Sequence, residues 1–422
     1  MEENNLFTKY QHGFYKGRST TTQLLQCLEM WTKWMDEGQP TDVLYLDFKK
    51  AFDSVPHIRL IKKIESYGIT GNVLKWITSF LTKRKQRVCV NGTLSSWTNV
   101  SSGVPQGSVL GPVLFSMYVN DMPDVVESFI MLFADDVKLF KPVQKMEDCE
   151  FMQKDIQNLQ TWSHDWQLDF QLTKCSVLRV GENHPDYEYK MTNDTGQEIR
   201  LASSSLERDL GVTIDKDLSF EKHIQTIVKK ANQITGLMWR SFEYIDEKTF
   251  NLLYKSMIRS HLEYASSVWS PHLWRLAKLI ESVQRRATKR VPNVKDLDYE
   301  SRLRKLKLPT LVYRRLRGDL INTYKYIHEY YNTESVLPQT ADNERTRGHK
   351  YRLKRTTANN NTRRFFFSNR IVCWWNSLPD EVVEAPNITS FKAKLDYYFK
   401  DHPVLYDYKA LDHPQRPQMT IS

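Results

Sequence analysis

The chain is poor in cysteine, and the few cysteines that it has follow no recognisable pattern. Its 422 residues include five, an odd number, at positions 27, 89, 149, 175 and 373. None belongs to a Cys-x-x-Cys or Cys/His spacing. A disulfide framework or a zinc site would require paired or closely spaced cysteines. The sequence therefore indicates a reducing compartment and argues against both kinds of site.

Long apolar runs are also missing. No window approaches the roughly 20 apolar residues that a membrane-spanning helix needs. The opening residues, MEENN, do not have the composition of a signal peptide. On these grounds we expect an intracellular protein that does not enter a membrane.

Acidic residues are outnumbered by basic ones. The chain has 60 Lys and Arg against 50 Asp and Glu, a formal charge of +10. Between positions 275 and 317 there are fourteen Lys or Arg and only four Asp or Glu. A solvated helix surface usually mixes the two signs, so this concentration favours a face that binds a polyanion. The predicted nucleic-acid contacts are Arg285, Arg286, Lys289 and Arg290.

A chain of this length is expected to hold two or three domains. Up to about residue 215, strand patterns mix with helical ones, which predicts an α+β sheet domain. The pattern is then helical to about residue 330. A polar tract suggests a flexible linker before a small C-terminal module. The predicted division is therefore 1–215, 216–330, 331–362 and 363–422.

Adjacent carboxylates interrupt the apolar pattern at Asp135 and Asp136. The flanking runs, 129–133 and 137–140, predict a β-hairpin with the aspartates at or beside its turn. Like charges beside a core cost free energy unless a cation holds them, and a divalent metal would do so. The alternative is a solvated turn. Asp47, at the end of the predicted buried strand 43–46, sharpens the metal interpretation, because two-metal phosphoryl transfer needs carboxylates from separate segments.

Two further segments leave alternatives open. The basic run 83–87 (KRKQR) is a nuclear import signal, a patch that grips a nucleic-acid backbone, or an exposed charged loop. It precedes a predicted hairpin whose turn begins with Asn91-Gly92. Near the C-terminus, Arg363 to Phe367 and Trp374-Trp375 either stack on bases or belong to a small packed module.

Three segments carry a resemblance to a known family. Residues 45–53 (YLDFKKAFD) resemble motif A of reverse transcriptases, 103–112 (GVPQGSVLGP) motif B, and 133–136 (FADD) motif C. They occur in the family's order and at plausible intervals. The chain is thus identified as a reverse transcriptase, with high specificity over about residues 11–215.

The sequences of other segments indicate which group of reverse transcriptases the chain resembles. QHGF at 11–14 and RST at 18–20 are similar to non-LTR retrotransposons of the LINE type, near the jockey and CR1 groups. Residues 162–174 resemble motif D and 210–212 motif E. The resemblance implies a right-hand polymerase palm with partial fingers, an all-helical thumb and the small C-terminal module. It also implies a location in the cytoplasm and nucleus.

Residue by residue, the resemblance implies that Asp47, Asp135 and Asp136 are catalytic and bind Mg²⁺ or Mn²⁺, with Asp136 less important for direct ligation. Lys174 matches the motif D lysine, a candidate proton donor to pyrophosphate. Gln171 stands where the family usually has Asn, which concerns loop geometry only.

The same comparison implies a nucleotide pocket. Phe52 matches the aromatic residue that closes off the sugar 2′ position, so deoxynucleotides are the implied substrates. Gln106 and Gly107 would line the pocket for the incoming nucleotide and the template. The expected partners are an RNA template, a DNA primer or target, and dNTPs.

Only ten residues precede Gln11, so we expect the upstream fingers strands and the N-terminal endonuclease of such elements to be missing, as in a truncated copy or the C-terminal part of a polyprotein. Two alternatives to an active RNA-directed DNA polymerase follow. One is an inactive remnant that only binds RNA or DNA. The other, an RNA-directed RNA polymerase, is disfavoured because Phe52 would exclude a ribose 2′-OH.

Overall fold

The computed structural model describes residues 6–341 and 348–410, which divide into two compact units. The first unit holds the chain up to residue 23 together with residues 38–205. The second holds residues 24–37 and the chain from 206 onward. This boundary is near the predicted end of the sheet domain at 215, and the four-part division proposed from the sequence stays a prediction.

A five-stranded sheet organises the first unit. Its order is β11 (Ala202–Ser204), β8 (Ser176–Val180), β1 (Thr41–Leu46), β7 (Asp136–Pro142) and β6 (Phe129–Phe133). β1 lies in the middle and is antiparallel to both neighbours. Its apolar residues are buried, as expected for a strand covered on both faces. The predicted hairpin at 129–140 is confirmed as β6 and β7.

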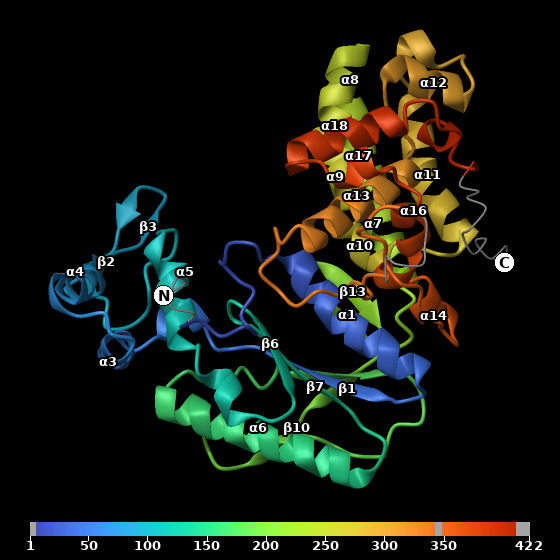
Figure 1. The fold of residues 1–422 in the computed structure, drawn as a ribbon. Helices are drawn as coiled ribbons and strands as arrows, with labels where there is room; N and C mark the ends of the chain where they lie inside the picture. Colours follow the sequence, from blue (N-terminus) through green and yellow to red (C-terminus); the bar gives the residue numbers. More distant parts are fainter. Residues whose placement is uncertain (1–5, 342–347, 411–422) are drawn as a thin grey trace. The chain divides into compact units, whose positions relative to one another are not determined.

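Helices complete the core around this sheet. α6 (Met146–Trp166) covers one face, where its Ile156 and Leu159 share a cluster with Leu44 of β1 (Figure 1). α3 (His57–Ser66) and α5 (Leu110–Tyr118) contribute Leu60 and Leu114 to the same cluster. The remaining elements of this unit are α2 (Ala51–Ser54), α4 (Gly71–Leu81), β2 (Lys85–Gln86), β3 (Cys89–Val90), β4 (Thr93–Leu94), β5 (Thr98–Asn99), η1 (Met122–Val125), β9 (Lys190–Thr192) and β10 (Glu198–Arg200).

One predicted strand is shorter than expected. The apolar pattern predicts a strand over 170–180, but β8 begins only at Ser176. Residues 169–174 instead form a loop, because their backbone bonds to the segment that follows β1. The hydrogen bonds run from Lys49 N to Asp169 O and from Gln171 N to Asp47 O.

The second unit is predominantly helical, as predicted. It contains the greater part of α1 (Thr20–Asp36) and the hairpin of β12 (Leu206–Asp209) and β13 (Val212–Asp215). The helices that follow are α7 (Glu221–Ser241), α8 (Glu247–Leu253), η2 (Tyr254–Ile258), α9 (Arg259–Glu263), α10 (Ser266–Trp269), α11 (Trp274–Thr288), η3 (Pro292–Val294), α12 (Tyr299–Leu306) and α13 (Leu311–Ile327). The chain is thus an α+β protein with a palm-like sheet unit and a helical unit.

The C-terminal residues pack against α13. Its Leu320 and Tyr324 share a core with Trp374, Trp375 and Phe391. Both tryptophans are almost fully buried. The packed alternative for this segment is therefore correct, and base stacking by these tryptophans is excluded in this fold. The elements are α14 (Asn361–Arg364), α15 (Phe367–Arg370), α16 (Val372–Asn376), α17 (Asp380–Val383), α18 (Ile388–Tyr398) and η4 (Pro403–Leu405).

None of the helices in the described ranges is both long and apolar enough to cross a membrane.

Candidate active site

Three aspartates reach the same end of the central sheet. β1 ends at Leu46, which pairs with Val137 of β7, so Asp47 follows directly beyond the paired residues, level with Asp136. Phe133 and Asp136 close the β6–β7 hairpin and leave Ala134 and Asp135 as its two-residue turn. The register of neighbouring strands therefore gathers acidic residues that are almost ninety positions apart in the sequence.

Gln11 holds the turn that carries Asp135. Its side chain is completely buried, and Oε1 accepts hydrogen bonds from the backbone N–H of Ala134 at 2.9 Å and of Gly13 at 2.8 Å. Its Nε2 donates to the carbonyl oxygen of Ala134 at 3.3 Å. Ala134 has a left-handed backbone with φ of 56°, a conformation that alanine adopts at a cost. The glutamine amide thus stabilises a strained turn beside the acidic residues.

Gly13 allows residues 11–13 to lie close to the turn at Ala134. A Cβ at this position would lie 2.5 Å from the backbone nitrogen of Ala134, so only glycine leaves room. The neighbouring backbone continues the contact, since His12 N donates to Leu132 O at 2.8 Å. The sequence singles out Gln11 only through the family resemblance of QHGF at 11–14.

Lys174 neutralises part of the acidic cluster. Its Nζ lies 2.9 Å from Oδ2 of Asp47, and both side chains are partly exposed. The hydrogen bond to Asp47 raises the pKa of Lys174 above its ordinary value. The lysine predicted as a proton donor is therefore a charged group in direct contact with a predicted catalytic aspartate.

Asp135 has a perturbed pKa. Burial raises its pKa above the usual value, and the nearby negative charge of Asp47 raises it further. A backbone hydrogen bond and the charge of Lys174 act in the opposite direction. Two carboxylates that repel each other in a partly buried site are a common feature of catalytic centres.

The loop before Lys174 is fixed to the end of β1. Phe48 forms an isolated antiparallel bridge with Phe170, and the two rings stack with centroids 4.7 Å apart. Gln171 N donates to Asp47 O at 2.7 Å. The side chain of Gln171 also bonds to Thr173 Oγ1 at 2.9 Å within the loop. These contacts place Lys174 beside Asp47.

The predicted nucleotide pocket residues also come together. Phe52 is half-buried and stacks on Phe115 of α5, with ring centroids 4.7 Å apart. Its carbonyl oxygen accepts from Val104 N at 2.7 Å, which fastens the loop of residues 101–108 to the end of motif A. Gln106 is exposed, and its Nε2 donates to Asp53 Oδ1 at 3.0 Å.

Two glycines of this loop differ in function. A Cβ on Gly103 would lie 2.7 Å from the backbone of Asp53, so this glycine allows two chain segments to touch. Gly107 has φ of 77° and is exposed, with open space where a side chain would be. The surroundings of Gly107 therefore leave room for a ligand against the backbone.

The donor set is that of a hard cation. Within residues 6–341 and 348–410, no three His, Cys, Asp or Glu side chains approach closely enough to form a metal site. Asp47 is engaged with Lys174, and Asp136 is exposed on β7. Asp47 is nevertheless close enough for its charge to raise the pKa of Asp135, and the carboxylate oxygens of both residues are ligands that Mg²⁺ prefers.

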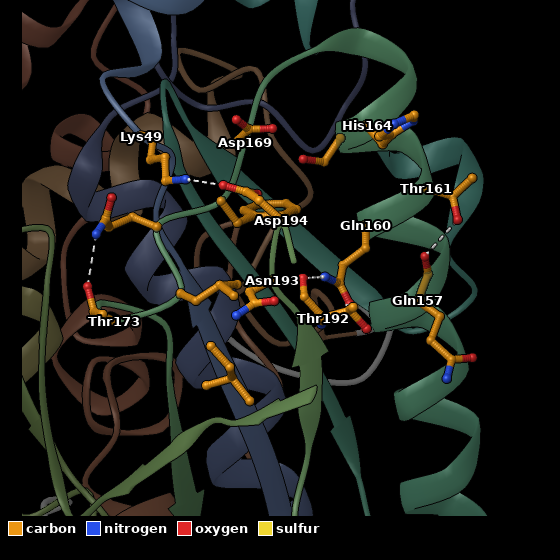
Figure 2. A pocket seen from close by; sticks show the side chains of 15 residues that line it. Lys49, Gln157, Gln160, Thr161, His164, Asp169, Thr173, Thr192, Asn193 and Asp194 are labelled. Atoms are coloured by element: carbon orange, nitrogen blue, oxygen red, sulfur yellow. Dashed lines mark hydrogen bonds and ion pairs between the residues drawn. The ribbon is translucent and has the colours of Figure 1, made fainter. Parts of the chain in front are cut away.

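A separate cleft of about 670 Å³ lies beside this region (Figure 2). α6 contributes Gln157 and Gln160 to its lining, and the segment after β9 contributes Asn193 and Asp194. Gln160 holds the backbone of Thr192 through both amide atoms, and Lys49 pairs with Asp194 at 3.1 Å. None of the predicted catalytic side chains lines this cleft. The polar contacts described above join residues of the protein to one another.

The predicted nucleic-acid contacts belong to the second unit. Arg285 and Arg286 lie on α11, and Lys289 and Arg290 follow at its end. All four are exposed. Arg286 also donates to Asn232 of α7 at 3.0 Å, and Arg290 lies 5.1 Å from the ring centre of Trp239. These cations form one exposed face, which we call the α11 basic face.

Curated relatives of this chain are polymerases of mobile elements. The chain is 28% identical over 304 residues to "Probable RNA-directed DNA polymerase from transposon X-element" of Drosophila melanogaster, covering 68% of this chain and 32% of that protein. It is 28% identical over 282 residues to "RNA-directed DNA polymerase from mobile element jockey" of Drosophila funebris, covering 64% and 30% respectively. The chain thus spans about a third of the length of these relatives.

Among solved structures, the apo telomerase of Candida Tropicalis superposes with a TM-score of 0.40 at 9% identity, covering 75% of this chain and 51% of that one. Residues 1–214, half of the chain, match the family "Reverse transcriptase (RNA-dependent DNA polymerase)". Together with the transposon relatives, this match places the chain in the reverse transcriptase family, among the enzymes of LINE-type non-LTR retrotransposons.

Proposed function

We propose that this chain catalyses RNA-directed DNA synthesis, adding deoxynucleotides to the 3′-OH of a primer. The observation that carries the proposal is the meeting of Asp47 and Asp135 at one end of the sheet, with Lys174 bonded to Asp47. Carboxylates from separate segments with an adjacent cation suit a reaction in which negative charge builds up on a leaving pyrophosphate.

The acidic pair would hold the metal ions. Asp47 and Asp135 supply carboxylate oxygens, and Asp136 is the neighbouring third acid. When bound, Mg²⁺ or Mn²⁺ would activate the attacking hydroxyl and neutralise charge on the phosphates. Burial and the negative charge of Asp47 raise the pKa of Asp135, and a bound cation would offset both effects, which supports the assignment.

Lys174 would interact with the pyrophosphate leaving group. As an ammonium ion it offers up to three hydrogen-bond donors and a proton. The loop that carries it is fixed to the backbone of Asp47, so the lysine is held near the reacting phosphates. We expect it to stabilise pyrophosphate and to donate a proton to it.

Phe52, Gln106 and Gly107 would bind the incoming nucleotide. The ring of Phe52 is supported from behind by Phe115, so it presents a rigid wall. Such a wall beside the sugar would exclude a 2′-OH and select dNTPs. Gln106 and the open backbone at Gly107 would contact the nucleotide and the template.

Primer extension tests the proposal. The wild-type chain, an RNA template with a DNA primer, dNTPs and Mg²⁺ should give extended product. Asp135→Ala should abolish it, whereas Asp217→Ala, which removes an exposed acid of the second unit, should not. Circular dichroism would establish that each variant is folded. Equal extension by wild type and Asp135→Ala would refute the proposed catalytic role.

The competing function is binding without catalysis. The α11 basic face favours it, because four exposed cations attract phosphates whether or not the aspartates react. RNA binding by wild type and Asp135→Ala, with no extension by either, would support this alternative.

A further inference from the structure

The backbone of Asp53, the last residue of motif A, is fixed from two directions. Asp53 N donates to Lys50 O at 2.8 Å at the start of α2, and Asp53 O accepts from Ser102 Oγ at 2.8 Å. Gly103 lies directly against Asp53, since a Cβ on this glycine would be 2.7 Å from the Asp53 Cα. A firmly held backbone therefore carries the Asp53 carboxylate beside the loop of residues 101–108.

Gln106 lies at the tip of a β-turn in this loop. Ser108 N donates to Pro105 O at 3.4 Å, and Gly107, the third residue of the turn, has φ of 77°. A glycine with positive φ at this position is typical of a type II turn, whose second residue here is Gln106. The Gln106 side chain is exposed, so contacts of its amide group decide how it is oriented.

The contact between the two side chains has a fixed direction. Gln106 Nε2 donates to Asp53 Oδ1 at 3.0 Å. An ionised carboxylate only accepts hydrogen bonds, so Asp53 binds the NH₂ end of the amide and not its carbonyl end. Within residues 6–341 and 348–410, the Gln106 Oε1 atom has no hydrogen-bond partner. The amide thus keeps an acceptor oxygen available for a ligand.

We propose that Asp53 is a positioning residue, which fixes the Gln106 amide so that its carbonyl oxygen meets a hydrogen-bond donor of the nucleotide or template. The consequence for nucleotide binding rests on the function proposed above. A glutamine side chain that moves freely in the unbound protein loses conformational entropy when a ligand orders it, which weakens binding. The bond to Asp53 orders the Gln106 side chain before the ligand arrives.

Steady-state primer extension measures this consequence. Asp53→Ala should raise KM for dNTP by about 2- to 10-fold, the effect of leaving one long side chain unordered, with a smaller change in kcat. Asp186→Ala removes an exposed acid from the loop between β8 and β9 and should leave both constants unchanged. In a Gln106→Ala background, Asp53→Ala should have no further effect on KM. A further rise in that background would show that Asp53 acts independently of Gln106 and would overturn the proposal.

A reversed pair tests the direction of the hydrogen bond. Gln106→Glu alone places a second carboxylate against Asp53, and the two like charges repel each other. Asp53→Asn together with Gln106→Glu keeps the net charge of the pair, reverses the hydrogen bond and still leaves an acceptor oxygen for the ligand. We expect Gln106→Glu to raise KM for dNTP more than the double variant does. Equal KM values for these two proteins would contradict the positioning role.

Nuclear magnetic resonance tests the contact in the absence of catalysis. With selective isotopic labelling of glutamine, the side-chain amide signal of Gln106 is identified by its loss in Gln106→Ala. Asp53→Ala should shift this signal, because Gln106 Nε2 donates to Asp53, whereas Asp186→Ala should not.

The two measurements separate this proposal from the preceding one. A signal that shifts in Asp53→Ala, together with no extension by the wild type, supports the positioning of Gln106 and contradicts the proposed activity. A signal that does not shift overturns the positioning role, even if extension by the wild type is normal.

Discussion

Gln11 is the residue whose importance is least visible from its chemistry. Its amide makes three hydrogen bonds around the Ala134 turn, and each loss would leave a buried backbone group without a partner. Gln11→Ala is expected to lower the free energy of unfolding by about 1–3 kcal/mol. Because the turn carries Asp135, we also expect kcat to fall more than KM for dNTP rises.

Urea unfolding and steady-state primer extension would measure the two effects. Gln23→Ala is a suitable control, since Gln23 is also fully buried but its side-chain amide makes no hydrogen bond within the described part of the chain. Gly13→Ala, which pushes a methyl group against Ala134, should reproduce the kinetic effect. Unchanged kcat in both turn variants would contradict a positioning role.

Phe52 provides a second test at the scale of one side chain. Phe52→Ala should open space beside the sugar, because the ring fills the region in front of Phe115. We expect the preference for dNTP over rNTP, measured as the ratio of kcat/KM values, to fall about tenfold or more. Phe80→Ala removes another half-buried ring, on α4, and should leave the ratio unchanged. Unaltered sugar selectivity in Phe52→Ala would argue against the assigned wall.

At the scale of elements, a buried acid on α11 links stability to pH. Glu281 is 2% exposed and accepts hydrogen bonds from Tyr299 OH at 2.6 Å and from Leu311 N, at the start of α13, at 2.9 Å. Burial raises its pKa to about 7 from an ordinary value of 4.5, although Arg315 acts in the opposite direction. The folded state therefore binds the proton more tightly than the unfolded state.

It follows that Glu281 destabilises the fold as pH rises from about 4.5 to about 7, and not further above pH 7. Glu281→Gln keeps an acceptor oxygen and removes the titration. We expect the variant to match the wild type at the low end of this range and to be more stable above pH 7 by about 3 kcal/mol. Urea unfolding of both proteins across this range, taken as a difference, cancels other titrating groups. A pH-independent difference would show that Glu281 is not the group responsible.

Elements also show what could be predicted from the sequence. The hairpin of β6 and β7 and strand β1 followed from apolar runs interrupted by aspartates, because local pattern and burial agree there. Residues 170–174 were expected to belong to the next strand, yet they form a loop. Backbone groups of Asp169 and Gln171 bond to Lys49 and Asp47, which are more than a hundred positions away, and no local pattern reports such a contact.

The candidate site also combines features that the sequence predicted with features that it did not. Motifs predicted Asp47, Asp135 and Lys174 as site residues, and the structure brings Lys174 to Asp47; their roles stay a prediction. The hydrogen bonds of Gln11 around the Ala134 turn could not be predicted, since a glutamine near a glycine is typical of many loops. The tryptophans at 374 and 375 were ambiguous for a similar reason: an aromatic pair near arginines suits both a core and a base platform until burial is known.

At the scale of the whole molecule, the formal charge of +10 predicts attraction to nucleic acid, and the α11 basic face gives it a location. Neutralised phosphates release counterions, so binding should weaken steeply with salt. We expect the affinity for an RNA–DNA duplex to fall as the salt concentration rises from about 50 to about 200 mM. The slope of log K against log salt should depend on this face.

Arg285→Gln with Lys289→Gln removes two neighbouring cations of the α11 basic face while keeping polar side chains of similar reach. If both contact phosphates of the duplex, the magnitude of the slope should decrease by about 1.8, from about 0.9 for each contact. The variant Lys62→Gln with Lys154→Gln lowers the net charge equally and should leave the slope nearly unchanged, because a local contact, and not total charge, sets the number of released ions. Equal slopes for the two double variants would show that binding follows overall charge and would remove the α11 basic face as a specific contact.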